Sequence, residues 1–364
     1  MHKITLGLVT DPGLPTDIAT AIADGLPAVL EERVSDQVQW TIELHSEALP
    51  LDGDGRLFIW KHSDRLKREY GWDLLICISE LTRRIDNELV ISEVNLDYQA
   101  AMVALPTLGP VRLRHHVRTA IVRVSRVLLS DDLQPDRTEA AGKRPLKQLR
   151  AETTSPRRDT SNDPEAGKTS SLRLRGTIGR IRMLLGMIRI NRPWRLVPSL
   201  SSAFAAAAAT SAFGIFYSSI WAMANSLTPL RQSWVTLIAI IAMITWLIVY
   251  NHMWEKPKNA AWKRDARMYN TATVLSVGVG VGFFYVLLFA LSLLAGLAII
   301  PPSYFETTLG RSVDLFSYIS LAWLSTSMGT IAGALGSSFE DDSAIRQATY
   351  GRREIERYEA REED

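Results

Sequence analysis

Four long segments without a charged residue constrain this chain more than any other feature of its sequence. No Asp, Glu, Lys or Arg occurs in residues 196–230, 232–254, 268–305 and 315–339. Each segment is longer than the roughly 20 apolar residues that a helix needs to cross the hydrocarbon core of a bilayer. We therefore predict four transmembrane helices, at Leu200–Ala224, Trp234–Asn251, Thr271–Ile300 and Leu315–Ser337.

Basic residues predict the orientation of these spans. Seven arginines lie between residue 172 and the first span, five basic residues lie between the second and third spans, and five follow the fourth. The two remaining loops hold one basic residue each, Arg231 and Arg311. Cytosolic loops of membrane proteins carry the excess of Lys and Arg, so we expect a multi-pass protein of the plasma (inner) membrane with both termini in the cytosol.

Small residues are frequent in the predicted spans. Gly278 and Gly282 have the GxxxG spacing of closely packed helices, and Gly329, Gly333 and Gly336 occur among hydroxyl residues of the fourth span. Such residues let helix backbones approach each other, so we predict a tight bundle, either within one chain or between copies in a homo-oligomer. No charged side chain occurs in the middle of a span, which argues against a proton relay or a voltage sensor.

Residues 1–130 are predicted to form a soluble α/β domain. Apolar runs at Ile4–Val9, Val38–Leu44 and Asp73–Ile78 have the character of strands and alternate with helical segments. Two further strands, at Glu88–Val94 and Ala100–Leu105, precede a final helix. This order predicts a mixed sheet covered by helices, with Glu88–Val94 as an edge strand because its polar and apolar residues alternate. The N-terminal residues lead into a strand and do not have the pattern of a secretory signal peptide.

Polar residues follow the first and third predicted strands. The carboxyl ends of parallel strands meet at one edge of an open α/β sheet, where ligands commonly bind. We therefore predict a small-ligand site there, although capping and turn formation explain the same residues equally well. The sequence has no GxGxxG and no Walker A loop, so we predict no cofactor, no metal and no catalytic residue. The candidate ligand-binding residues are Thr10, Asp11, Gly13, Ser79, Glu80 and Thr82.

The predicted order of strands and helices is loosely similar to the sheet of metzincin proteases. In that family the final helix carries His-Glu-x-x-His, whereas the matching segment here reads His115-His116-Val117-Arg118-Thr119. Adjacent histidines point about 100° apart on a helix and cannot ligate one zinc ion as an i, i+4 pair does. The resemblance therefore covers topology alone.

Residues 131–171 and 339–364 differ in composition from the α/β domain and from the membrane region, which covers 199–338. The first segment has four prolines and almost no large apolar residue, which predicts a disordered linker. The second has charges of both signs at helical spacing, which predicts an exposed helix in a charged cytosolic tail.

Residues 172–198 are predicted to form a basic amphipathic helix next to the membrane. Its apolar residues fall on one helical face, and arginines recur every seven residues on another. Arginines so close to a membrane span favour contact with anionic lipid headgroups, and no DNA-binding motif accompanies them, so we expect no nucleic-acid partner. The candidate headgroup-binding residues are Arg175, Arg182, Arg189, Arg192 and Arg195.

The stretch Asn191-Arg192-Pro193-Trp194-Arg195-Leu196-Val197 resembles an uncharacterised family of bacterial inner-membrane proteins. The resemblance implies a cytosolic α/β domain on a four-helix membrane region, and it implies no function. Our leading hypothesis is a non-enzymatic membrane protein whose α/β domain senses or docks a partner. The alternatives are a component of an oligomeric channel or transporter, and a membrane-tethered enzyme that uses the α/β domain.

Overall fold

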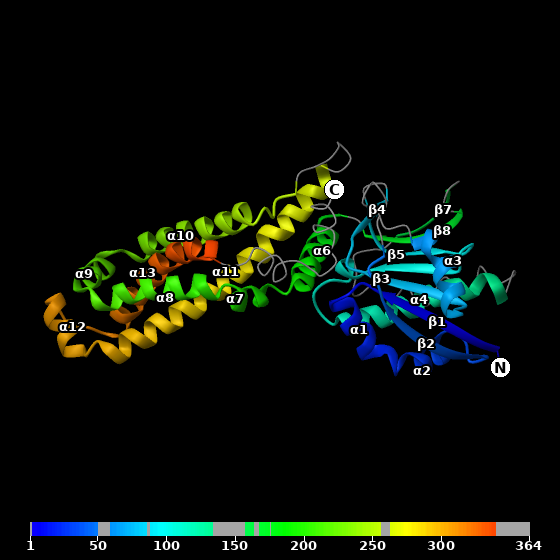
Figure 1. The fold of residues 1–364 in the computed structure, drawn as a ribbon, viewed down its shortest axis with the longest axis horizontal. Coiled ribbons are helices and arrows are strands. Elements are labelled where there is room, and N and C mark those ends of the chain that lie inside the picture. The colour runs from blue at the N-terminus through cyan, green and yellow to red at the C-terminus, as the bar shows by residue number, and fades with distance from the viewer. Residues whose placement is uncertain are drawn as a thin grey trace. The chain divides into compact units, whose positions relative to one another are not determined.

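The computed structural model describes residues 2–49, 59–85, 88–133, 157–163, 167–174, 176–255 and 263–339 (Figure 1). The chain forms two compact units that divide between Ile190 and Asn191. We call the described part of the first unit the head and that of the second unit the bundle, and each is described by itself.

A sheet of eight strands forms the centre of the head in the described residues. The strands follow the order β2-β1-β3-β6-β5-β8-β7, and β4 pairs with β5 outside this path. Strands β2, β1, β3 and β6 are parallel, whereas β5, β8 and β7 join by antiparallel pairing. The strands are β1 His2–Thr10, β2 Val38–Ser46, β3 Leu74–Ser79, β4 Arg83–Ile85, β5 Glu88–Asn95, β6 Ala100–Ala104, β7 Arg157–Asp163 and β8 Gly167–Leu174.

Helices cover both faces of this sheet. Val9 packs with Ile59 and Trp60 of α3 in one core cluster, whereas the Thr10 hydroxyl contacts Thr16 of α1. Since adjacent strand residues point to opposite faces, α1 and α3 lie on opposite sides of the sheet. Helices α2 and α4 contact α1 and each other, so they share its side. The elements are α1 Leu14–Ala23, α2 Leu26–Arg33, α3 Ile59–Tyr70, the 3-10 turn η1 Leu105–Leu108 and α4 Leu113–Leu133.

The predicted mixed α/β sheet is confirmed, with two differences in its second half. Strand β5 pairs with both β6 and β8, so it is an interior strand and not the expected edge. Strand β7 and residues 167–171 of β8 lie in the segment 131–171, where we predicted a disordered linker. The small hydroxyl residues Thr169, Ser170 and Ser171 of β8 are buried beside β5. Composition alone counts serine and threonine as favouring disorder, because the pairing with β5 is not visible in the local sequence. The rest of the linker, 134–156 and 164–166, lies outside the described residues, as does the tail from 340 onwards.

Helix α6, Gly176–Asn191, takes the place of the predicted juxtamembrane helix. It begins later than residue 172 because Leu172–Leu174 belong to β8. Gly176, with φ near +86°, permits the turn from the strand into the helix. All of α6 except its last residue belongs to the head.

The bundle is all-helical in the described residues and contains three helices long and apolar enough to cross a membrane. The segments Gly176–Ser199 and Ser201–Phe216 become a fourth candidate if they are taken as one bent span. This arrangement is consistent with a membrane protein. The elements are η2 Pro193–Arg195, α7 Leu196–Ser199, α8 Ser201–Phe216, α9 Ser218–Ser226, α10 Pro229–Tyr250, α11 Lys263–Ile299, α12 Pro302–Leu309, α13 Leu315–Gly336 and η3 Ser337–Phe339.

The first predicted span, Leu200–Ala224, is not one continuous helix. It divides at Tyr217 into α8 and α9, and the indole N–H of Trp221 donates to the carbonyl oxygens of Gly214 and Ile215 at 3.0 and 3.1 Å. These two carbonyls are at the end of α8, where no helical partner follows. Trp221 thus satisfies polar backbone groups that would be costly to leave unpaired in an apolar environment.

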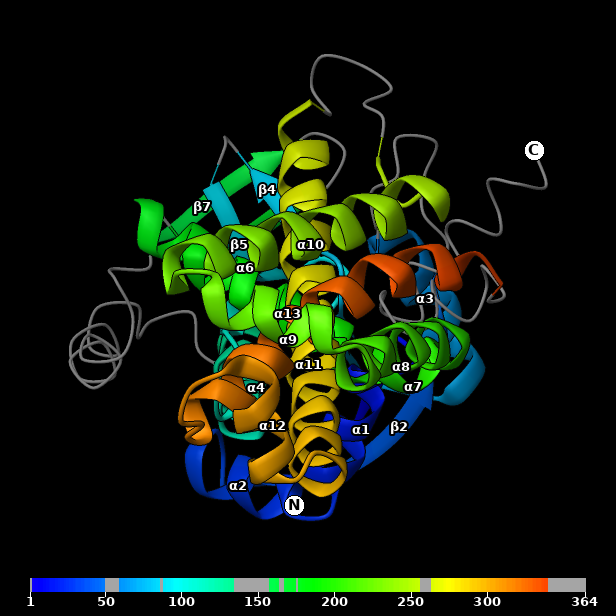
Figure 2. The ribbon, with the colours of Figure 1, turned by 90° about the vertical axis from the view of Figure 1, so that its left-hand side faces the viewer.

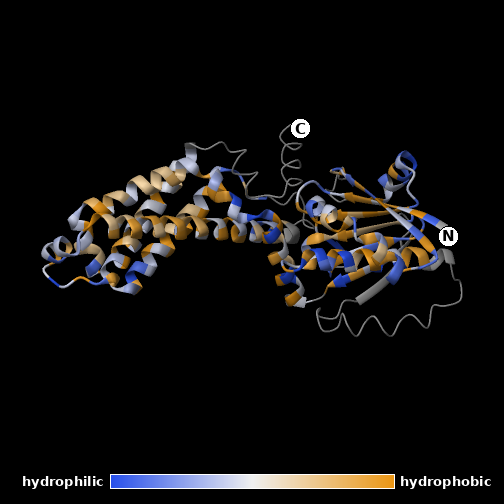
Figure 3. Ribbon diagram, turned by 90° about the horizontal axis from the view of Figure 1, so that it is seen from below, coloured by the Kyte–Doolittle hydropathy of each residue, from blue (hydrophilic) through white to orange (hydrophobic). Residues whose placement is uncertain are grey.

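Helix α13 forms the centre of the bundle, in contact with α8, α10 and α11 (Figure 2). It is the least hydrophobic and the most buried of the three long candidate spans. Large aliphatic and aromatic side chains are instead exposed along α10 and α11, among them Ile238, Ile241, Val286 and Leu294. Hydrophobic residues accordingly predominate along the long helices of this unit (Figure 3). An apolar exterior around a more polar interior is expected when lipid is the solvent.

Candidate functional site

The carboxyl ends of β1, β2 and β3 bring together the polar residues that we predicted as a ligand site. Strand β1 lies between β2 and β3, and Thr10 at its end is in register with Ser46 on one side and Ile78 on the other. The chain leaves β1 for the α1 side of the sheet, and it reaches β3 from α3 on the other side. This is a point where the direction of the connections reverses, the position at which open α/β sheets commonly hold ligands.

Asp11 joins the loops that follow β1 and β3. Its Oδ2 accepts hydrogen bonds from the Ser79 hydroxyl at 2.7 Å and from the Glu80 backbone N–H at 2.8 Å. The Ser79 oxygen in turn accepts from the Leu81 N–H at 3.1 Å. Asp11 and Ser79 are both fully buried, so this carboxylate is a structural tie between two loops beneath the surface of the site.

Three hydroxyl groups lie above this tie. The Thr16 hydroxyl donates to the Asp11 carbonyl oxygen at 2.9 Å, and its oxygen lies 2.9 Å from the hydroxyls of both Thr10 and Ser46. The Thr10 hydroxyl also donates to the His45 carbonyl oxygen at 3.5 Å, and either oxygen can be the donor in its contact with Thr16. Ser46 is the exposed member of this cluster, and its hydroxyl is open to solvent.

The remaining predicted residues border the cluster. Gly13 precedes α1 with φ near +110°, a conformation that favours glycine, and it accepts from the Asp17 N–H. Glu80 is half-buried, and its backbone takes part in the Asp11 tie. Thr82 is half-buried and directly precedes β4. The structure thus brings Thr10, Asp11 and Ser79 into one network, with Gly13 and Glu80 beside it.

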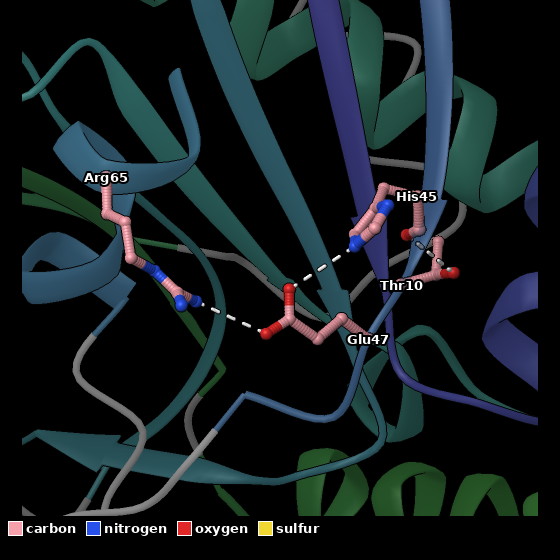
Figure 4. A network of polar contacts seen from close by, with 4 residues as sticks. All are labelled: Thr10, His45, Glu47 and Arg65. Carbon is pink, nitrogen blue, oxygen red and sulfur yellow. Dashed lines mark hydrogen bonds and ion pairs between the residues drawn. The ribbon is translucent and has the colours of Figure 1, made fainter. Parts of the chain in front are cut away.

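A second polar group on the α3 side of the same sheet edge was not predicted (Figure 4). Glu47 Oε1 lies 3.2 Å from Arg65 Nη2 of α3, and its Oε2 lies 3.3 Å from His45 Nε2. The His45 ring lies 4.8 Å from that of Tyr70, which stacks on Trp72. The alternation of β2 could have placed His45 on this face, but its pairing with residues of α3 depends on tertiary structure.

Partial burial raises the pKa of the Tyr70 hydroxyl, and the nearby carboxylates of Glu69 and Glu47 raise it further. Tyr70 therefore remains protonated and neutral at physiological pH. The exposed ring of Tyr70 and the Arg65 guanidinium give this side of the edge a mixed aromatic and charged character.

The predicted headgroup arginines occupy different environments. Arg182 donates from Nη2 to the Leu108 carbonyl oxygen at 2.8 Å, so this side chain is held within the head. Arg189 and Arg192 are half-buried, and Arg195 is exposed in η2. Arg175 lies outside the described residues.

The predicted helix-packing glycines of α13 are closely packed against another helix, whereas those of α11 are not. A Cβ on Gly329 would lie 2.5 Å from the Ala207 carbonyl oxygen of α8, and one on Gly333 would lie 3.1 Å from that of Ala203. Gly336 would meet Ala206 of the same helix at 2.7 Å. These three glycines therefore pack α13 against α8 within one chain.

The GxxxG pair of α11 behaves differently. A Cβ on Gly278 would meet the tip of Ile244 at 3.5 Å, and one on Gly282 would meet no described atom within 4 Å. The close approach of α11 occurs instead at Gly280, where the added carbon would lie 2.6 Å from Cδ2 of Leu196.

Hydroxyl groups of the spans are used inside the bundle. Thr236 of α10, Tyr285 of α11 and Ser327 of α13 lie within 2.9–3.1 Å of one another, and the Trp323 indole donates to Thr236 at 2.6 Å. Other hydroxyls of α13, such as that of Thr326, donate to carbonyls of their own helix. These hydrogen bonds connect α10, α11 and α13 within one chain.

No group of three or more His, Cys, Asp or Glu side chains in the described ranges is arranged to hold a metal ion. Comparisons with protein-family models, with curated proteins and with solved structures gave no match, so no family is identified for this chain.

Proposed function

We propose that the protein is a membrane-anchored sensor whose head binds a small ligand at the carboxyl edge of β1, β2 and β3. The hydroxyl cluster of Thr10, Thr16 and Ser46 above the buried Asp11 carboxylate carries the proposal. The exposed hydroxyl oxygen of Ser46 can accept hydrogen bonds, and the Asp11 carboxylate beneath the cluster favours positive charge, so we expect a ligand with N–H or O–H donors, cationic or neutral. Amines, amino sugars and polyols have this chemistry.

The helical bundle supports the anchoring part of this proposal. Its exposed apolar helices suit the bilayer, and the distribution of basic residues favours a plasma (inner) membrane protein with the head and both termini in the cytosol. A sensor on this side of the membrane would bind a cytosolic metabolite. Ligand binding across the loops after β1 and β3 would order the start of α1.

Hydrogen–deuterium exchange of the full-length protein in detergent tests the ligand site. Glucosamine, arginine and spermidine serve as donor-rich probes, and citrate and ATP serve as anionic ones. At least one donor-rich probe should slow exchange in residues 10–17 and 78–82. That protection should disappear in a Thr16→Val, Ser46→Ala double variant.

Thr119→Val provides the matched control, since the Thr119 hydroxyl donates to the His115 carbonyl within α4, away from the sheet edge. It should retain the protection. Equal protection in the double variant, protection by the anionic probes alone, or no protection by any of these probes would contradict the proposal.

A further inference from the structure

Helix α6 has two apolar faces, and the head buries only one of them. The buried face carries Gly179, Met183, Gly186, Met187 and Ile190. On the opposite face Ile178, Ile181 and Leu185 are 61%, 56% and 45% exposed. Their spacing of three and four residues places them in one stripe along the helix. We call these three residues the α6 stripe.

The buried face fixes α6 to the head. Gly186 approaches the Pro106 carbonyl of η1 so closely that a Cβ there would overlap it. Arg182 donates to the neighbouring Leu108 carbonyl oxygen at 2.8 Å and lies over Gly109. Gly179 packs beside Leu174, the last residue of β8. The orientation of the α6 stripe, away from the head, is therefore set by packing and hydrogen bonding.

The chain around the stripe indicates what covers it. Helix α6 ends at Asn191 and α8 begins at Ser201, and the two helices belong to the two arms of the bent candidate span. Arg180 of α6 is exposed, and Trp194 of η2, the turn that follows α6, is 43% exposed. Exposed aliphatic residues with arginine and tryptophan next to a span are typical of helices that lie in the membrane interface.

We infer that the α6 stripe is a membrane-docking surface that inserts into the headgroup region of the leaflet from which α8 departs. A soluble partner could cover three aliphatic side chains, but only the nine residues 192–200 separate the end of α6 from α8, so the bilayer is always within reach. On this inference α6 contacts the membrane surface directly. This inference rests on the membrane anchoring in the proposed function and is independent of the ligand site.

Fluorescence of a single label tests the inference in the full-length protein, reconstituted into vesicles of equal parts phosphatidylcholine and phosphatidylglycerol. Cys77, which is buried, is replaced by alanine, and an NBD label is attached through cysteine at Ile181. Glu31, exposed on α2, gives the aqueous control, and Ile241, exposed on α10, gives the membrane control. Two sets of lipids, with the doxyl quencher either near the headgroup or near the end of the acyl chain, report depth; the first set is used for the label at 181 and the second for the label at 241.

The label at residue 181 should emit at shorter wavelength than the label at residue 31, and quencher lipid should reduce its emission several-fold. A label at Leu185 should behave in the same way, which guards against a local effect of one substitution. If the label at 241 is quenched but those at 181 and 185 emit like that at 31, the docking inference is wrong while the anchoring stands. If the label at 241 is not quenched either, both are wrong.

Discussion

Replacing Gly329 by alanine tests how closely α13 packs against α8. The added Cβ would lie 2.5 Å from the carbonyl oxygen of Ala207 and 3.2 Å from Cδ2 of Leu288. The leucine methyl group can turn aside. The carbonyl belongs to the backbone of α8, so relief of this overlap requires the two helices to separate.

The expected loss of stability in Gly329→Ala is the cost of overpacking minus the gain in helix propensity. Overpacking costs about 1–3 kcal/mol, and an overlap with backbone places Gly329→Ala near the upper value. The better helix propensity of alanine offsets about 1 kcal/mol of this cost. A net loss of about 2 kcal/mol corresponds to a fall in Tm of roughly 4–8 °C for a unit of this size.

The assay is the fraction of full-length protein that remains monodisperse in detergent after heating, measured by size-exclusion chromatography. Gly282→Ala is the matched control, because no described atom lies within 4 Å of its added Cβ and only the propensity gain remains. Its Tm should stay constant or rise slightly. Equal falls in the two variants, or an unchanged Tm for Gly329→Ala, would refute the assignment of the α8–α13 interface.

Three further outcomes are expected. Ser79→Ala removes a hydrogen bond to a buried carboxylate and should lower the free energy of unfolding of the head by about 1.5–3 kcal/mol in denaturant titrations, whereas an unchanged value would show that the tie is dispensable. The backbone N–H and the hydroxyl in the first turn of α13 lower the pKa of Asp314, so its capping contribution is present at neutral pH and is lost as pH falls through that lowered pKa. Protection factors of the amides in the first turn of α13, which correct for the intrinsic pH dependence of exchange, should therefore fall on strong acidification, and Asp314→Asn should reduce this fall. Cysteines placed in Asn225–Gln232 and Ser303–Arg311 should react with an impermeant reagent from outside intact cells, and labelling only after lysis would overturn the predicted orientation.

The candidate ligand-site residues show how far sequence reasoning extends. The rule that parallel strands end at one edge predicts from the sequence that Thr10, Asp11 and Ser79 lie together, as they do in the structure. It could not show that Asp11 ties two loops, because that depends on the register between β1 and β3. The contacts of His45 and Glu47 were not predicted for a similar reason. Glu47 pairs with Arg65 of α3, and the His45 ring lies beside Tyr70, the last residue of α3, which stacks on Trp72.

For the helices, the sequence predicts which segments are apolar but not which residues contact a neighbouring helix. Hydropathy located the apolar segments well, because the need to cover a span with apolar side chains is a property of the sequence. The GxxxG spacing of Gly278 and Gly282 suggested a contact that the structure places at Gly280. A helix can rotate about its own axis without any change in its pattern, so the residue that meets a neighbour is decided by the neighbour. Strands β7 and β8 were missed because their polar residues pair through the backbone.

The central position of α13 has a consequence for how the protein is made. The spans are synthesised in chain order, and α13 is both the last of them and the least hydrophobic. A segment of this kind gains little from lipid alone, because its serine and threonine hydroxyls need partners. By the time it leaves the ribosome, α8, α10 and α11 have already been synthesised and can offer it a protein-lined slot. A chain truncated before residue 315 would therefore leave the faces of α8, α10 and α11 that α13 covers without their partner.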